Sequence, residues 1–384
     1  MMMRNAVLVA AAMTAALSAQ TRTPTSAPGA SPARPASPAA CTTATDACTE
    51  FVTLGGGPAR SLIYRTHSLN ARNDAIRRAL IMVHGTNRNA DHYFSTATAA
   101  AFLAGAIDDT VVISPRIASN SVRAGAAPGR GGGGCSDVLA ANEVNWSCNG
   151  DSWRSGGNST SHPDLTSFDF VDQILRKLAN TSTFPNMKAI VVAGHSAGGQ
   201  FVARYQMANR IHETLGVPIT YVVANPSSYA WPDATRPTAA ADAAPDNAKA
   251  AWQTEDVHTK FSYGPFEAGS CANYDKWPFG LESRTSGYTA KMSDDQLKKQ
   301  LVSRPTTFLF GQVDVLPLGG FDSSCGAMAQ GTTRRARGEA YVKYLNETLG
   351  AKHAVQIVSE CGHNDRCVYT TDKVFPAIFP KAGQ

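Results

Sequence analysis

Short apolar runs and longer amphipathic stretches alternate along this chain from residue 51 onward. Continuous runs rich in Val, Ile, Leu or Phe are typical of strands that are buried on both faces of a parallel sheet. Such runs occupy residues 79–83, 110–114, 189–193, 219–224, 306–310 and 354–358. Two earlier runs, 51–54 and 61–65, flank a Gly-Gly-Gly-Pro segment and predict an opening hairpin.

Between these runs, apolar residues at helical spacing predict helices over residues 91–104, 167–178, 198–211 and 333–349. Asp164 or Ser167 would cap the start of the second helix. Alternation of strands and helices predicts an α/β fold with a mostly parallel central sheet flanked by helices on both sides.

Two long insertions, about 116–161 and 226–304, interrupt this alternation. Both follow predicted strands, so we expect them to emerge as loops or lids at the carboxyl edge of the sheet, where open α/β sheets bind ligands. The first insertion contains Trp146 and Trp153. These side chains would either line an aromatic substrate cleft or pack the insertion onto the sheet.

The composition is that of a globular chain: of 384 residues, 43% are hydrophobic and 17% are charged. Such a chain can bury the core of one large domain or two small ones, which excludes wholesale disorder. The net charge of +5 is spread without a dense Lys/Arg block. We therefore expect no nucleic-acid partner. The sequence does not indicate an oligomeric state.

The N-terminal segment predicts export. Residues 1–19 place Arg4 before an apolar run that ends at small residues, as in a signal peptide. The run is too short to span a bilayer, so we expect no stable membrane anchor and a secreted or periplasmic protein. Residues 20–40 are rich in Pro and Ala and predict a linker, which leaves residues 41–384 as the catalytic domain. Lipid attachment at Cys41 is disfavoured because Cys41 lies far beyond the apolar run.

Eight cysteines behind an export signal favour disulfides over free thiols. Closeness in sequence suggests Cys41–Cys48, Cys135–Cys148 and Cys361–Cys367, with Cys271 left for Cys325, although sequence alone does not fix this connectivity. Cys361, His363 and Cys367 also have a spacing compatible with zinc. They lack a clear fourth ligand, so we expect no metal and no other cofactor.

The strongest chemical signal is the segment Gly194-His195-Ser196-Ala197-Gly198, between a predicted strand and a predicted helix. This context is typical of a nucleophile elbow, which projects Ser196 above the sheet, although a tight structural turn is the alternative. The Ala197 N–H would supply half of an oxyanion hole at the start of the helix. The second donor should come from the His-Gly segment at residues 84–87, with Thr86 as first choice and Asn87 as second.

A nucleophilic serine needs a base, and the base needs an acid to hold its tautomer. Asp314 lies just past the predicted strand 306–310, and His363 lies just past the predicted strand 354–358. Both should therefore reach the same sheet edge as Ser196. Asp322 is the nearest rival of Asp314, and His195 should point away from Ser196.

These residues resemble the α/β-hydrolase superfamily of serine esterases and lipases, in which GHSAGG, VHGT, FGQVDVLP and CGHN would occur in their usual order. The wider strings VVAGHSAGGQFVARY and YVVANPSSY are similar to secreted bacterial hydrolases. The resemblance implies the fold and a triad of Ser196, Asp314 and His363, but no substrate. The chain lacks the multi-glycine loop of some carboxylesterases and the cysteine beside the nucleophile of tannase-like enzymes, so neither substrate class is assigned.

The sequence therefore predicts a serine hydrolase that cleaves small or polymeric carboxylic esters through an acyl-enzyme on Ser196. The same triad would also serve a polyester depolymerase, or a hydrolase of carbon–carbon bonds in β-diketones, as in the enzymes that act on oxidised polyvinyl alcohol. A secreted, non-enzymatic binding module would be favoured by a missing triad member, and none is missing.

Overall fold

The computed structural model describes residues 39–120, 135–238, 251–252, 260–267, 269 and 271–381. The predicted signal peptide, most of the linker and parts of both insertions lie outside the described residues. The chain from Ser37 onward forms one compact unit. No helix in the described ranges is long and apolar enough to cross a membrane.

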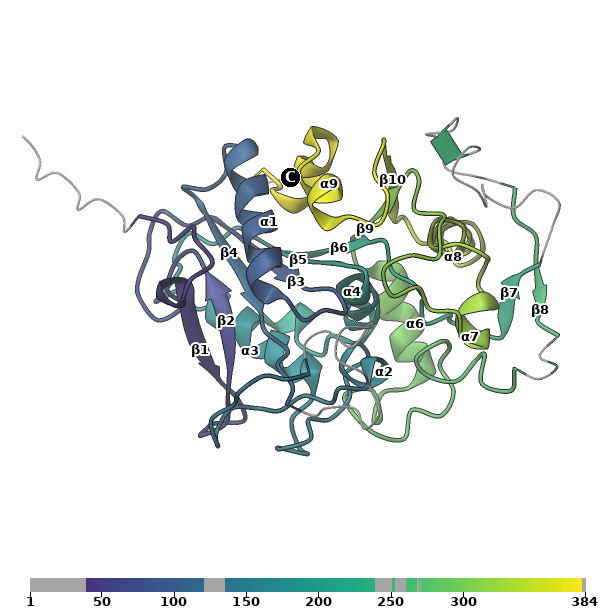
Figure 1. Ribbon diagram of the computed structural model, residues 1–384, viewed down its shortest axis with the longest axis horizontal. Helices are drawn as coiled ribbons and strands as arrows, with labels where there is room; N and C mark the ends of the chain where they lie inside the picture. Colours follow the sequence, from purple (N-terminus) through teal and green to yellow (C-terminus); the bar gives the residue numbers. More distant parts are fainter. Residues whose placement is uncertain are drawn as a thin grey trace, which may run out of the picture. The chain divides into compact units, whose positions relative to one another are not determined.

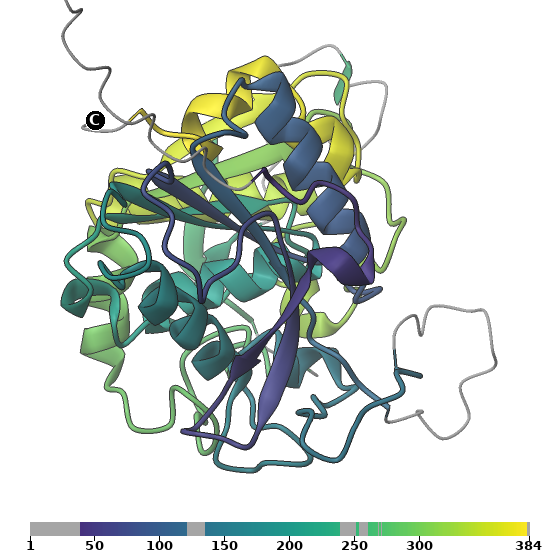
Figure 2. The ribbon, with the colours of Figure 1, turned by 90° about the vertical axis from the view of Figure 1, so that its left-hand side faces the viewer.

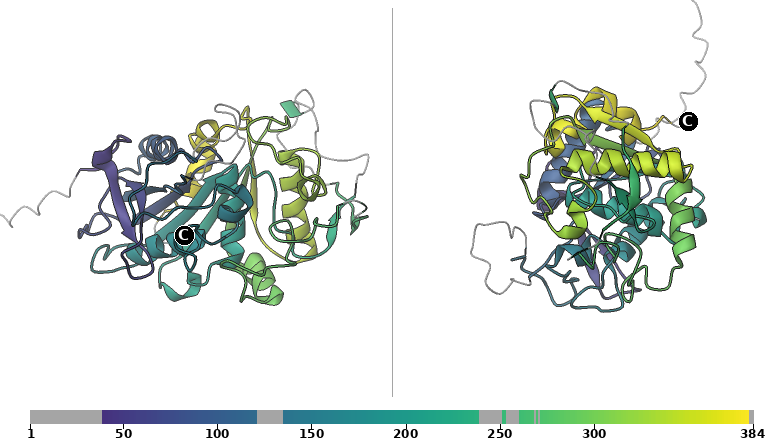
Figure 3. Two further views of the ribbon diagram at one scale, coloured as in Figure 1. Left: turned by 60° about the horizontal axis from the view of Figure 1, so that its bottom comes forward. Right: turned by 90° about the vertical axis from the view of Figure 1, so that its right-hand side faces the viewer.

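A sheet of eight strands, in the order β1-β2-β4-β3-β5-β6-β9-β10, forms the centre of this unit (Figure 3). Its strands are β1 (Thr49–Thr53), β2 (Arg60–Arg65), β3 (Arg78–Val83), β4 (Thr110–Pro115), β5 (Ala189–His195), β6 (Ile219–Ala224), β9 (Thr306–Gly311) and β10 (Ala354–Val358). β1 and β2 form the predicted antiparallel hairpin, drawn in purple in Figure 2, and β2 also runs antiparallel to β4. All remaining pairs are parallel, which confirms the predicted sheet.

Both faces of the sheet are covered by helices (Figure 1). Successive side chains of a strand point to opposite faces, so in β3 Ala79, Ile81 and Val83 belong to one buried cluster while Leu80 and Met82 belong to the other. The first face packs against α3 (Ser167–Leu178), α4 (Ala197–Ala208) and α8 (Arg334–Thr348); the second packs against α1 (Ala90–Leu103), α9 (Asp365–Tyr369) and α10 (Phe375–Ile378). Burial on both sides explains the continuous apolar runs.

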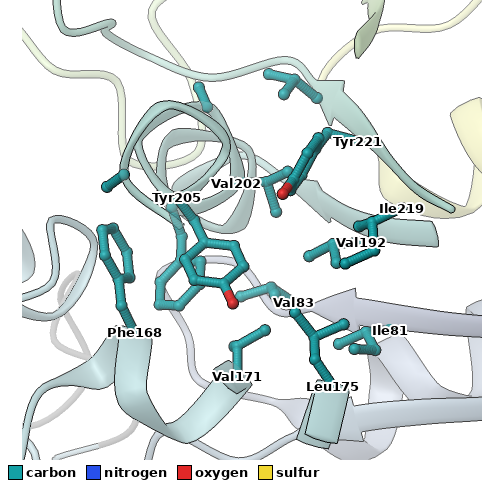
Figure 4. Close-up of a cluster of buried hydrophobic side chains, with 14 of the residues drawn as sticks. Ile81, Val83, Phe168, Val171, Leu175, Val192, Val202, Tyr205, Ile219 and Tyr221 are labelled. Atoms are coloured by element: carbon teal, nitrogen blue, oxygen red, sulfur yellow. The ribbon is translucent and has the colours of Figure 1, made fainter. Parts of the chain in front are cut away.

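The contact between α3 and α4 fixes the element that follows Ser196. Figure 4 shows Phe168 and Val171 of α3 beside Tyr205 of α4, while Val202 of α4 lies toward Val192 and Ile219 of the sheet. The Phe168 ring packs edge-on against Tyr205, with 5.2 Å between the ring centroids. Helix α4 is thus held in place by packing against α3 and the sheet.

Helix α3 begins at Ser167, as expected, but its cap differs from the prediction. The cap is Thr166, whose side chain accepts from the Asp169 N–H while the Asp169 carboxylate accepts from the Thr166 N–H. Neither Asp164 nor Ser167 takes this role. The signal is Thr166 followed three residues later by an acidic residue, which forms a capping box.

The second insertion contains more regular structure than predicted. Helix α6 (Asp294–Ser303) begins after the capping Ser293 and packs against α4, and β7 (Thr235–Pro237) pairs with β8 (Tyr263–Pro265). Two short helices, α2 (Gly150–Trp153) and α7 (Cys325–Met328), lie outside the sheet. Sequence reasoning treated the two insertions as loops or lids, although Ser293 before two acidic residues is a usable start signal for α6.

The cysteines form the four disulfides that closeness in sequence suggests: Cys41–Cys48, Cys135–Cys148, Cys271–Cys325 and Cys361–Cys367. Both thiols of the alternative zinc cluster around His363 are therefore used in one bridge. A zinc ligand must be a thiolate, so the structure does not support that alternative.

Candidate active site

Ser196 occupies a strained turn between β5 and α4, with φ of 58° and ψ of −119°. The turn packs tightly on the neighbouring backbone: a Cβ placed on Gly198 would lie 2.1 Å from the Val83 oxygen, and one on Gly194 would lie 2.3 Å from the Gly198 oxygen. No larger residue fits at either position without backbone movement. The two glycines therefore permit the elbow, and the strain at a non-glycine residue is typical of a functional position.

Three side chains from different strand ends form one hydrogen-bonded line. His363 Nε2 lies 2.9 Å from Ser196 Oγ, and His363 Nδ1 lies 2.8 Å from Asp314 Oδ2. The Asp314 side chain is almost fully buried, and with Nδ1–H donated to its carboxylate, Nε2 is free to accept from the serine hydroxyl. The rival Asp322 accepts from the Ser324 N–H.

The Asn225 side chain joins the loops that carry Asp314 and His363. Its Oδ1 accepts from the Gly311 N–H at 2.8 Å, and its Nδ2 donates to the Gly362 oxygen at 3.2 Å. Asn225 has a φ of 46°, a conformation that asparagine tolerates better than most residues. Sequence reasoning missed this residue, which directly follows β6 in the segment YVVANPSSY.

A buried cation lies behind the carboxylate of Asp314. The Arg334 guanidinium donates to Asp314 Oδ1 at 3.3 Å and to Ser227 Oγ at 2.7 Å. It also donates to the carbonyl oxygens of Leu318 and Gly319. Burial lowers the pKa of Arg334, and the charge of Asp314 opposes that shift. Sequence reasoning missed Arg334 too, because no local motif marks a buried arginine.

The two predicted oxyanion donors, the N–H groups of Ala197 and Thr86, belong to the start of α4 and to the turn after β3. Ala197 is the first residue of α4, so its N–H is one of those that the helix leaves unpaired. Thr86 lies in the exposed turn after β3. Within the described ranges, neither N–H donates to a protein acceptor.

The His84 side chain fixes the peptide that carries the Thr86 N–H. Its Nε2 accepts from the Ile117 N–H at 3.1 Å, so its Nδ1 carries the proton and donates to the Gly85 oxygen at 2.9 Å. The carbonyl and the N–H of a trans peptide point in opposite directions, so holding the Gly85 oxygen also orients the Thr86 N–H. Burial lowers the pKa of His84 to about 3, which keeps the imidazole neutral.

His195 lies in a second layer behind His363. Its Nδ1 lies 3.0 Å from the Tyr93 hydroxyl, and its ring centroid lies 4.7 Å from that of His363. Burial lowers the pKa of His195 well below its usual value. Its hydrogen bonds go to Tyr93 and Asn225 rather than to Ser196, so it supports the site by packing.

The two tryptophans of the first insertion lie in the core, in contrast to the proposed substrate cleft. Trp146 is 1% exposed and stacks on Phe170, while Trp153 is 2% exposed and packs against His84 and Phe201. Neither leaves an open face for a ligand. Both side chains instead pack the first insertion onto the sheet, and Trp153 does so next to His84 in the turn after β3.

The arrangement defines a class of protein. A mostly parallel sheet, an elbow after β5 and then an aspartate and a histidine after later strands, in that chain order, are the features of the α/β hydrolases. The alpha/beta hydrolase family model matches residues 80–372. The chain therefore belongs to the α/β-hydrolase family.

Solved structures of hydrolases share this fold. LpqC, a poly(3-hydroxybutyrate) depolymerase from Bordetella parapertussis, is 20% identical, with 83% of each chain covered and a TM-score of 0.51. Poly(aspartic acid) hydrolase-1 from Sphingomonas sp. KT-1 is 18% identical, with 83% of this chain and 94% of that chain covered and a TM-score of 0.52. At such identities the likeness shows the fold alone. The sequence matched no curated protein.

Proposed function

We propose that this protein is a serine hydrolase that cleaves carboxylic esters through an acyl-enzyme on Ser196. The observation that carries the proposal is the unbroken hydrogen-bonded line from Ser196 Oγ through His363 to Asp314, with distances of 2.9 and 2.8 Å. A free serine hydroxyl hardly ionises at neutral pH, and this line supplies the base that it lacks.

In the proposed reaction, Ser196 Oγ attacks the ester carbonyl carbon while His363 Nε2 takes the hydroxyl proton. The Ala197 and Thr86 N–H groups donate to the oxygen that gains charge, and Asp314 stabilises the imidazolium. Collapse of the tetrahedral intermediate expels the alcohol, which takes the proton from His363. Water then repeats the sequence on the acyl-enzyme and releases the acid.

We also propose that the enzyme acts outside the cytoplasm, in the medium or the periplasm. Four disulfides, together with the signal-like residues 1–19, support this location, because disulfides persist in oxidising compartments.

The test is turnover of p-nitrophenyl acetate and labelling by a fluorophosphonate, which requires an activated serine. Ser196→Ala should abolish both turnover and labelling. Ser182→Ala should change neither, because Ser182 is exposed in the connection that leads into β5, at the amino ends of the parallel strands. Full turnover by Ser196→Ala would refute the proposal. Turnover of a β-diketone, with no activity on any ester, would replace ester cleavage by carbon–carbon cleavage.

A further inference from the structure

The loop that follows Asp314 lies directly against the candidate active site. A Cβ placed on Gly319 would lie 3.2 Å from Cδ2 of His363, and one placed on Gly320 would lie 3.3 Å from Cγ2 of Thr86. Both glycines have positive φ values, 58° and 72°. The chain therefore passes closely between the candidate base and the turn that carries the candidate oxyanion donor.

The side chains that precede these glycines are apolar and face solvent. Leu316 is 44% exposed and Leu318 is 61% exposed. In the described part of the chain, large hydrophobic side chains with such exposure are few: Phe102, Leu103, Val138, Trp252, Leu316, Leu318 and Met328. Two of them, Leu316 and Leu318, lie within four residues of Asp314, in the same loop as Gly319 and Gly320. We call Leu316 and Leu318 the apolar rim.

The backbone that carries the apolar rim is anchored from within the protein. The Arg334 guanidinium donates to the Leu318 oxygen at 2.6 Å and to the Gly319 oxygen at 3.0 Å. The Arg334 side chain is completely buried. A buried cation that holds an exposed loop fixes the direction of that loop, so the exposure of the rim is built into the fold.

We propose that the apolar rim binds the carbon chain next to the scissile ester, so that the preferred substrates are esters with an extended apolar chain. This inference rests on the proposed ester hydrolysis and adds a substrate class to it. A substrate carbonyl group held between Ser196 and Thr86 would place the groups on either side of it beside Gly319 and Gly320. Because Leu318 directly precedes these glycines, a long carbon chain on the substrate would reach the apolar rim from there. Each methylene buried there strengthens binding about fourfold.

The extended chain has two possible sources with one shared chemistry: a soluble ester with a long alkyl chain, or a strand at the surface of a solid polyester. Both present methylene groups on at least one side of an ester carbonyl. An exposed rim can contact either a soluble alkyl chain or a polymer strand, because binding along the surface requires no deep pocket. Separate assays on soluble esters and on a film distinguish the two.

The test compares Leu316→Ser/Leu318→Ser with the control Phe102→Ser/Leu103→Ser. The control residues are 56% and 63% exposed at the end of α1, so both double variants remove similar apolar surface. We measure kcat/KM on p-nitrophenyl acetate and octanoate, and mass loss from an aliphatic polyester film. The ratio of octanoate to acetate activity, or the film rate relative to acetate, should fall about tenfold in the rim variant and less than about twofold in the control.

A fall of the octanoate ratio assigns the rim to soluble chains, and a fall confined to the film assigns it to polymer surfaces. If both ratios change no more in the rim variant than in the control, the rim does not bind substrate, and ester hydrolysis itself still stands. If the wild-type protein turns over no ester at all, the proposed function fails, and the rim inference fails with it.

Discussion

Arg334 contacts the carboxylate of Asp314 on the oxygen that His363 does not use: its Nη1 lies 3.3 Å from Oδ1, while His363 Nδ1 lies 2.8 Å from Oδ2. The candidate acid is therefore held between an imidazole and a buried guanidinium. Because the same guanidinium also anchors Leu318, the position of the acid and that of the apolar rim depend on one side chain of α8.

Arg334→Met should impair both stability and activity. Removing one partner of a buried ion pair leaves the other charge uncompensated, which typically lowers the free energy of unfolding by about 3–5 kcal/mol. Here the remaining charge is Asp314, so kcat/KM on p-nitrophenyl acetate should also fall more than tenfold. Urea unfolding and steady-state kinetics measure the two effects.

Arg236→Met provides the matched control. The Arg236 side chain is 1% exposed and pairs with Asp275, beside the β7–β8 sheet. It should lose similar stability but retain most of the activity of the folded protein. Equal losses of kcat/KM in the two variants would show that Arg334 supports the fold alone.

Opening the Cys361–Cys367 disulfide should lower the activity more than opening another disulfide that closes a loop of similar length. Cys361→Ser/Cys367→Ser opens a loop with a sequence separation of 6, and Cys41→Ser/Cys48→Ser opens one of 7 next to the edge strand β1. Loop entropy predicts a similar loss of about 2 kcal/mol in each. Only the first loop carries His363, so only that variant should show a lower kcat in the folded state. A similar kcat in both variants would separate the bridge from catalysis.

The central strands and the three candidate catalytic residues could be predicted because their signals are local. A strand buried on both faces must be a continuous apolar run, and the elbow requires glycines at fixed positions around Ser196. Asp314 and His363 follow from chain order, since each comes directly after such a run. These features need no knowledge of which distant residues meet.

Arg334 and Asn225 could not be predicted because their roles depend on contacts between distant segments. Asn225 bonds Gly362, which lies 137 residues away in sequence. Arg334 begins a helix that is rich in charged residues, and no local pattern shows that its side chain is fully buried. Trp146 shows the same limit: its residue type suits a cleft and a core equally, and only packing decides.

His84 should control the oxyanion donor through Gly85. His84→Asn keeps a donor near the position of Nδ1, and His84→Gln keeps an acceptor near the position of Nε2. If the bond to the Gly85 oxygen orients the Thr86 N–H, the Gln variant should lose about tenfold or more in kcat with little change in KM, while the Asn variant retains more. Kinetics on p-nitrophenyl acetate measure the split. A stronger loss in the Asn variant would assign the role to the bond with Ile117 instead.

Two buried groups outside the candidate triad, His353 and Asp172, should make the free energy of unfolding depend on pH in opposite directions. Burial lowers the pKa of His353 to about 4, so between pH 6.5 and 4 the unfolded chain binds more protons and stability falls as the pH falls. Burial raises the pKa of Asp172 to about 6, against the hydrogen bonds of Tyr205 and Tyr288. Between pH 6 and 3.8 the folded chain binds more protons at Asp172, so this contribution rises as the pH falls.

Substitutions should therefore change the acid response in opposite directions. In the wild type, the proton uptake of His353 on unfolding lowers the unfolding free energy by up to about 1.4 kcal/mol per pH unit as the pH falls. His353→Gln removes this contribution, so its unfolding free energy should fall less between pH 6.5 and 4.5 than that of the wild type. Asp172→Asn keeps an acceptor oxygen for one of the two tyrosine hydroxyls but removes the opposing contribution, so its unfolding free energy should fall more than that of the wild type between pH 6.5 and 4.5. Urea unfolding at pH 6.5 and 4.5 measures the change in unfolding free energy for each variant. Each change compares a variant with itself, so it does not depend on how stable that variant is at either pH. The same pH response in both variants as in the wild type would show that neither group changes its proton binding on folding.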